Sequence, residues 1–226
     1  LVLILGCNRD KCETMEGPRE KRDISIDPAS KIELNLVADL GVKVDTSQET
    51  QLEVIAQSGV FEKLNFSRIG EEMLYELDGC IRENEPILMS AIMPQLEQVT
   101  INSAGKVFSE AIVVNDYLRF TNKGLGDIDF VIKSDSIIGE VKSSGDLILS
   151  GSCRAFSFLS TSSGDLRAYN LVCDSLTLNL FGTSVCEVFT NGPLIINFFS
   201  PGVVNYRGVP SSIQITGDGQ VNNTNE

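Results

Sequence analysis

The chain has 226 residues, of which 42% are hydrophobic and 22% are charged. This composition supplies enough apolar side chains for a folded core and excludes a disordered or collagen-like chain. The 31 acidic residues exceed the 18 basic ones, and the net charge of −13 repels the phosphates of nucleic acids, so we expect no nucleic-acid partner. The sequence contains no histidine, which removes the usual general base and the Ser-His-Asp and Cys-His nucleophile pairs.

The first seven residues, LVLILGC, form an apolar run that is too short to span a bilayer. Its end, Ile4-Leu5-Gly6-Cys7, resembles the bacterial lipobox, which is cleaved just before a lipid-modified cysteine. We therefore expect residues 1–7 to be the remnant of a lipoprotein signal, with lipidation at Cys7 and a lipid anchor that makes the membrane a partner. A buried first strand that contains a small apolar cysteine is the alternative.

Residues 8–22 contain one large apolar side chain, Met15, and are expected to form a polar tether. From Asp23 to Leu77, apolar and polar residues alternate, as in Ile32-Glu33-Leu34-Asn35-Leu36, and turn residues separate the runs. This alternation predicts β-strands, and no segment shows the 3.6-residue period of a helix.

The C-terminal half repeats a glycine followed by strand-forming residues. The copies begin at Gly105, Gly126, Gly145, Gly164, Gly182 and Gly202. Two residues after the glycine, an apolar side chain recurs at Val107, Ile128, Leu147, Leu166 and Val204. A fixed period of about 19 residues indicates a repeat architecture, and stacked coils would place these side chains in interior columns about 4.8 Å apart.

Each repeat also carries a second apolar run, such as Leu176-Thr177-Leu178-Asn179-Leu180, so each coil contains at least two strands. We predict an all-β fold, a parallel β-helix (solenoid) with coils of about 19 residues, formed by residues 23–221 as one domain and followed by a polar tail at 222–226. An antiparallel sandwich explains the alternation but not the regular glycines. The copy at Gly182 lacks the aliphatic residue at its second position, which leaves the register of that coil open.

The end of the chain carries a more specific pattern, Tyr206-x-Gly208-x-Pro210 followed by Ile213-x-Ile215-x-Gly217-x-Gly219. Together with the glycine repeats and Pro94-Gln95-Leu96, this pattern resembles the putative auto-transporter adhesin, head GIN domain family, a bacterial domain family of unknown function. The resemblance covers about residues 23–221. It implies a right-handed β-helix exported to the bacterial cell envelope.

Together with the lipobox, the resemblance implies an outer-membrane lipoprotein on the periplasmic or the surface side. The family name suggests an adhesin or a scaffolding module whose ligand is an envelope glycan or protein. No catalytic residue and no cofactor is carried over from the family.

Six cysteines in an exported chain permit disulfides. With Cys7 lipidated, we expect Cys12 to pair with Cys80, because both lie beside turn signals and outside the repeats. We expect the remaining cysteines to be small buried residues: Cys153, Cys173 and Cys186. No C-x-x-C motif occurs, so we expect no zinc site.

Asp127, Asp146 and Asp165 directly follow three of the repeat glycines. Stacked one coil apart, three carboxylates repel one another unless solvent screens them or a cation such as Ca²⁺ bridges them. We expect these aspartates to make turn hydrogen bonds, with a cation row as the alternative.

A polysaccharide lyase or hydrolase is the rival function, because several parallel β-helices cleave acidic sugars with Asp-bound calcium and a basic residue. Its basic candidates are Lys133, Lys142, Arg154 and Arg167. The excess of acidic residues disfavours such substrates, and the chain has no tryptophan for sugar stacking, so we expect a non-catalytic binding module. Its exposed face would include an aromatic residue such as Tyr117, Phe120 or Tyr169.

Overall fold

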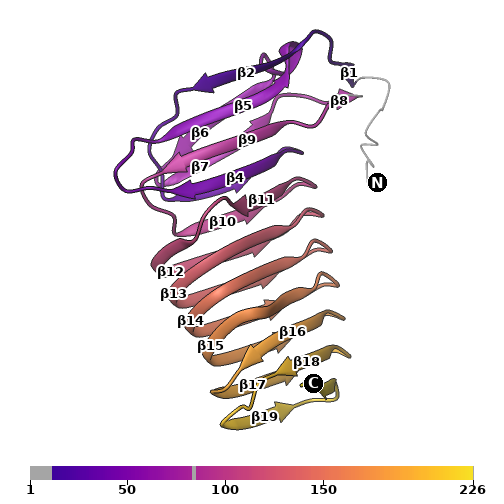
Figure 1. Ribbon diagram of the computed structural model, residues 1–226. Helices are drawn as coiled ribbons and strands as arrows, with labels where there is room; N and C mark the ends of the chain where they lie inside the picture. The colour runs from indigo at the N-terminus through magenta and orange to yellow at the C-terminus, as the bar shows by residue number, and fades with distance from the viewer. Residues whose placement is uncertain (1–11, 83–84, 226) are drawn as a thin grey trace.

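The protein is described here from a computed structural model that covers residues 12–82 and 85–225. Its strands wind into a β-solenoid of about seven turns with coils of about 19 residues. Figure 1 shows the coils stacked one upon another along the chain. The lipidation predicted at Cys7 lies outside the described residues. Within the described ranges, no helix has the length and apolar character needed to cross a membrane.

Two long sheets face each other across the interior. Sheet I contains, from the N-terminal end of the solenoid, β2 (Arg19–Ile24), β5 (Gln51–Gln57), β9 (Leu88–Met93), β4 (Asp39–Val44), β11 (Lys106–Ser109), the first parts of β13 (Ile128–Val141), β14 (Leu147–Ser160) and β15 (Leu166–Leu180), and then β16 (Val185–Thr190), β18 (Val203–Arg207) and β20 (Gln220–Asn223). Sheet II contains β6 (Leu64–Ile69), β7 (Glu72–Leu77), β3 (Lys31–Leu34), β10 (Gln98–Ile101), β12 (Val113–Asn122), the second parts of β13, β14 and β15, and then β17 (Pro193–Phe198) and β19 (Ser212–Thr216).

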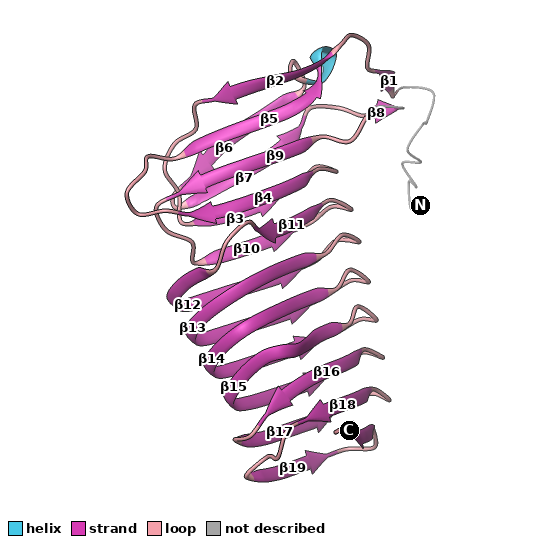
Figure 2. Ribbon diagram, in the orientation of Figure 1, coloured by secondary structure: helices cyan, strands magenta, loops and turns pink. Residues whose placement is uncertain are grey.

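Short elements lie at the N-terminal end of the solenoid (Figure 1). β1 (Glu13–Thr14) pairs in parallel with β8 (Ile81–Arg82), and a single 3-10 turn covers Ser58–Val60. Figure 2 shows this turn at the N-terminal end of the solenoid, and the rest of the described chain consists of strands and loops.

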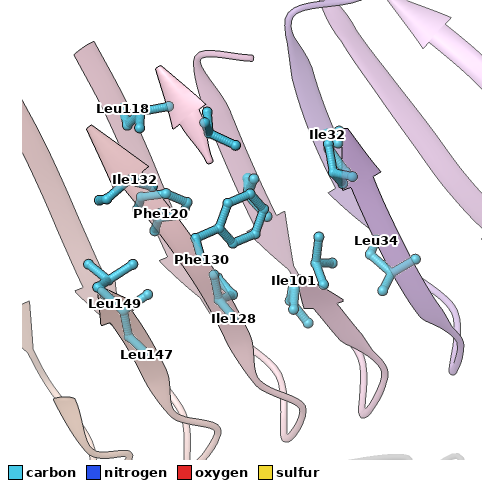
Figure 3. Close-up of a cluster of buried hydrophobic side chains, with 14 of the residues drawn as sticks. Ile32, Leu34, Ile101, Leu118, Phe120, Ile128, Phe130, Ile132, Leu147 and Leu149 are labelled. Carbon is cyan, nitrogen blue, oxygen red and sulfur yellow. The ribbon is translucent and has the colours of Figure 1, made fainter. Parts of the chain in front are cut away.

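The repeats stack in parallel, as the sequence predicted. Ile128 is paired with Leu147, and Leu147 with Leu166, so these three side chains form one interior column. All three are fully buried, and Figure 3 shows Ile128 and Leu147 on neighbouring strands beside Phe130 and Leu149. The parallel pairing excludes an antiparallel sandwich for this part of the chain.

The repeat glycines are needed because the turns of successive coils touch through their backbones. A β-carbon added at Gly126 would overlap the carbonyl oxygen of Gly105, and one added at Gly145 would overlap the carbonyl oxygen of Gly126. A side chain at these positions would force the coils apart, which explains the period seen in the sequence.

The register left open at Gly182 is shifted by two residues. Gly182 lies against Ser162, and Ser184 takes the place that Gly164 occupies in the preceding coil, because Leu166 is paired with Cys186. The buried thiol of Cys186 therefore fills the position of the aliphatic side chain, and burial raises its pKa. The coil from Leu166 to Cys186 is 20 residues long because β15 has one more residue than β14, whereas Gly182 follows Gly164 by only 18 residues, and the two differences from 19 add up to the shift.

The tether predicted at residues 8–22 is wrong for residues 12–22. β2 pairs antiparallel with β5 from Arg19 to Ile24, and Met15 is buried in the core. An edge strand is held largely by backbone hydrogen bonds, so its polar composition gave no sign of order. β5 also pairs antiparallel with β9, and β6 pairs antiparallel with β7. β2, β5 and β6 together cover the N-terminal end of the solenoid (Figure 1).

The tail predicted at residues 222–226 is also wrong for its described part. β20 extends to Asn223, the Thr224 amide donates to the Tyr206 carbonyl oxygen at 2.9 Å, and the Asn225 side-chain amide donates to the Gly208 carbonyl oxygen at 2.6 Å. The last residues therefore belong to the final coil.

Two disulfides are present in the described part of the chain. Cys12 and Cys80, the pair expected from the sequence, are joined beside β1 and β8. Cys153 and Cys173 are buried as expected, but they are also joined to each other across β14 and β15. A period of 19 residues would place Val172 beside Cys153, so the sequence did not predict this disulfide, and the additional residue in β15 is what brings Cys173 opposite Cys153.

Candidate functional site

The aspartate row forms part of the solenoid framework. The Asp146 amide donates to Asp127 Oδ1 at 3.0 Å, the Asp165 amide to Asp146 Oδ1 at 2.9 Å, and the Val185 amide to Asp165 Oδ1 at 2.9 Å. Each carboxylate thus binds the backbone of the next coil, which is the turn chemistry expected from the sequence. Among the described residues, no group of three or more acidic or cysteine side chains is arranged to hold a metal ion.

The basic residues considered for catalysis are not brought together. Arg167 pairs with Asp146 at 2.6 Å on sheet I, while Lys142 pairs with Glu140 at 2.7 Å on sheet II. The hydrogen bond from Lys142 and the charges of Lys142 and Arg119 hold the pKa of Glu140 below its usual range. These ion pairs join each basic side chain to a carboxylate of its own or of the neighbouring coil.

The other two, Lys133 and Arg154, line an open cavity of about 310 Å³ where the long strands bend from sheet I to sheet II. Arg154 makes two 2.8 Å hydrogen bonds to Asp135, which raise the pKa of its guanidinium, and Asp116 and Asp174 also line the cavity. Because Arg154 is already paired with a carboxylate of the neighbouring coil, its guanidinium is not free to act on a substrate.

The outward side of sheet II contains the largest chemical contrast on the solenoid. Towards the N-terminal end this side is densely charged, with Lys31, Glu33, Glu72, Glu76, Arg119, Glu140 and Lys142. Towards the C-terminal end, four successive strands carry no charge on this side, and the first charged side chain beyond them is the exposed Asp218, in the turn after β19 and one coil after Phe199. We call this surface the uncharged face, and its residues are Ala155, Ser157, Leu159 and Thr161 from β14 and its end, Ser175, Thr177, Asn179 and Phe181 from β15 and its end, Pro193, Ile195, Asn197 and Phe199 from β17 and its end, and Ser212, Gln214 and Thr216 from β19.

Strand alternation fixes which side chains form this face. In β14 the inward residues Phe156 and Phe158 are buried, so Ser157 between them points to solvent. The opposite side of the same coils, on sheet I, carries charged residues at Arg167, Glu187 and Arg207. The lack of charge is therefore a property of one face, not of the C-terminal coils as a whole.

Two ladders of identical side chains cross the uncharged face. Phe181 and Phe199 stack with their ring centroids 4.0 Å apart and their planes 2° from parallel, although they are 49% and 62% exposed. Beside them, Asn197 Nδ2 donates to Asn179 Oδ1 at 3.0 Å. The remaining amide groups, Asn179 Nδ2 and Asn197 Oδ1, make no hydrogen bond with another described residue, so they can bind an incoming group.

The aromatic residues expected at an exposed face lie elsewhere. Phe120 is fully buried and packs on Phe130, so the prediction for this residue is wrong. Tyr117 is 39% exposed on the charged part of sheet II, and Tyr169 lies on sheet I under the guanidinium of Arg207. Sequence reasoning missed the exposed phenylalanines, although each follows an alternating strand and the two lie one coil apart.

Residues 30–210 match the family model described as "Putative auto-transporter adhesin, head GIN domain". The chain belongs to this family. The resemblance inferred from the sequence is thereby confirmed, and the head GIN domain family places this chain among adhesin-like proteins. No curated protein matches the chain.

Three solved structures share the fold over almost their entire length. A putative adhesin from Bacteroides fragilis has 18% identity and a TM-score of 0.87, with 93% of this chain and 99% of that chain covered. A putative lipid binding protein from Parabacteroides distasonis has 18% identity and a TM-score of 0.78, with 94% and 99% covered. A putative adhesin from Parabacteroides merdae has 14% identity and a TM-score of 0.73, with 93% and 98% covered. At these identities the similarity shows a common fold.

Proposed function

We propose that this head GIN domain protein is a non-catalytic, adhesin-like binding module of the bacterial cell envelope, which engages its ligand through the uncharged face. The observation that carries the proposal is the uninterrupted lack of charge along four strands of one sheet in a chain with a net charge of −13. A solvated sheet normally carries charged side chains, as the opposite sheet does here, and a surface without them loses less hydration when a partner covers it.

We base the absence of a catalytic role on the contacts of the residues that would act in catalysis. The three aspartates accept backbone hydrogen bonds, and three of the four basic candidates, Lys142, Arg154 and Arg167, are paired with carboxylates. The membership of an adhesin family points in the same direction.

The attachment to the membrane rests on the lipobox-like sequence that ends at Cys7. We propose lipidation of Cys7 and an outer-membrane location. Metabolic labelling with an alkyne fatty acid, followed by fractionation of the envelope, tests this part: the wild-type chain should carry the label in the outer-membrane fraction, and Cys7→Ser should lose both. Labelling that persists in Cys7→Ser refutes the assignment of the anchor.

Binding by the uncharged face is tested with the full chain carrying Cys7→Ser, which removes only the site of lipid attachment. The chain is incubated with isolated bacterial envelopes and sedimented. Ser157→Lys places a positive charge in the middle of the uncharged face and should abolish co-sedimentation. Ser152→Lys on the same strand makes the same change of charge at the bend between the two sheets, outside the uncharged face, where it should have no effect. Equal behaviour of the two variants would refute the assignment of the face.

A further inference from the structure

We infer that the ligand of the uncharged face is a neutral, extended polysaccharide that lies along the axis of the solenoid. This inference rests on the proposed function, because it names the class of molecule that the same face binds. It is carried by the charge, the hydrogen-bonding groups and the spacing of the face.

Charge selects against several classes of ligand. The face offers no lysine or arginine to an anionic headgroup or an acidic sugar, and the net charge of −13 repels both. The strands of the face also offer no carboxylate to a basic peptide, and the single carboxylate of Asp218 stands at its end, one coil after Phe199. A neutral polymer is the ligand that neither loses an ion pair nor leaves a charge desolvated when it covers this surface.

The polar groups of the face suit hydroxyl groups. Serine and threonine hydroxyls and asparagine and glutamine amides both donate and accept hydrogen bonds, as sugar hydroxyls do. They recur across the strands: Asn179, Asn197 and Thr216 form one column, and Ser157 is paired with Thr177 in another. A single hydrogen bond of this kind raises affinity only about fivefold, so tight binding requires a ligand that repeats its hydroxyls along the column.

The spacing of the rows favours an extended chain. Neighbouring strands of a sheet lie about 4.8 Å apart, which is close to the length of one pyranose unit in an extended β-linked chain. A polymer running along the solenoid therefore presents hydroxyls to each successive coil, and the same edge of the sugar ring returns at every second coil where neighbouring units are turned over.

The phenylalanine pair completes the site. Phe199 is 62% exposed, and one side of its ring is covered by Phe181. Its remaining apolar surface, at the C-terminal side of the column, can pack against the C–H groups of a sugar ring, as aromatic side chains do when they bind apolar surfaces.

The experiment is calorimetric titration of the full Cys7→Ser chain with neutral hexasaccharides, namely cellohexaose, xylohexaose, mannohexaose and chitohexaose. Polygalacturonate and phosphatidylcholine vesicles serve as the charged-polymer and lipid probes. We expect at least one neutral hexasaccharide to bind and neither of the other probes to do so. Ser157→Lys and Phe199→Ala should each weaken that binding about tenfold or more, and Ser152→Lys should leave it unchanged.

The outcomes separate this inference from the proposed function. If Ser157→Lys abolishes binding to envelopes but no neutral hexasaccharide binds, the proposed function holds and the polysaccharide inference is overturned. Binding of the vesicles or of polygalacturonate at this face also overturns it. Sedimentation velocity tests the remaining occupant: a wild-type dimer that Ser157→Lys dissociates identifies a second copy of the chain as the ligand and overturns the inference.

Discussion

Replacing Leu147 with alanine tests how the two sheets pack across the interior. Leu147 is fully buried between Ile128 and Leu166, and it lies against the backbone of Gly139 on the opposite sheet. A β-carbon added at Gly139 would be 2.7 Å from Leu147 Cδ2, which is closer than carbon atoms approach in proteins. The leucine therefore occupies the space that a side chain at Gly139 would need.

The size of the effect follows from this contact. Leu→Ala substitutions in cores cost about 2–5 kcal/mol, depending on how far the site can collapse. Gly139 has no side chain that could move into the cavity, so we expect Leu147→Ala to lower the free energy of unfolding by about 3–4 kcal/mol. In the wild-type background, Gly139→Ala overpacks the same space and should cost about 1–3 kcal/mol.

The double variant gives the decisive comparison. Once Leu147 is shortened, the nearest atoms to the new β-carbon are Phe156 Cε2 at 3.1 Å and Phe158 Cδ2 at 3.2 Å, which small movements can accommodate. Gly139→Ala should then stabilise the Leu147→Ala protein by about 1 kcal/mol, a coupling energy of about 2–4 kcal/mol. Urea unfolding gives the free energy of unfolding of the wild type, the two single variants and the double variant. Additive effects would refute the contact between the sheets.

Two further predictions concern the turns and the ion pairs. Gly126→Ala should lower the free energy of unfolding by about 3 kcal/mol or more, because the new β-carbon would overlap backbone atoms of the preceding coil. The control is Ser144→Ala, in the exposed turn of the next coil, which should change the free energy of unfolding by less than about 0.5 kcal/mol. Urea unfolding measures both. Glu140, whose pKa is lowered in the folded protein, stabilises the fold above its unfolded pKa of about 4.3, and this contribution is lost as the pH falls through the lower folded value. Glu140→Gln should therefore reduce stability by about 1 kcal/mol at pH 7 and by progressively less below about pH 4, and a difference that does not depend on pH would contradict the ion pairs.

The repeat architecture was predictable because it depends on local signals that recur. Gly126, Gly145 and Gly164 stand where the backbones of neighbouring turns touch, and the residue two positions after each of them points inward. Ile128, Leu147 and Leu166 could therefore be placed in one column from the sequence alone. The aspartates could be assigned to turn hydrogen bonds for the same reason: each follows its glycine at a fixed position in the coil.

Other features depend on contacts that are not local in sequence. The order of β2 comes from backbone pairing with β5, and hydropathy does not detect a strand whose side chains are nearly all polar. The shift at Gly182 follows partly from one additional residue in β15 relative to β14, which a fixed period cannot anticipate.

The candidate site was less predictable than the framework. Phe120 was expected to be exposed, but it points inward because the strand alternation of β12 places it beside Phe130. The uncharged face becomes visible only when the outward residues of four coils are placed side by side, and this requires the register that the structure supplies.

The stacking of the coils is measured most directly by nuclear Overhauser effects between methyl groups of the protein in solution, with isoleucine and leucine methyls labelled. The structure predicts cross-peaks from Ile128 to Leu147 and from Leu147 to Leu166, because these residues are paired on adjacent strands. Both cross-peaks should be present in the wild-type chain. Their absence, with assigned and resolved methyl signals, would contradict the solenoid and with it the uncharged face.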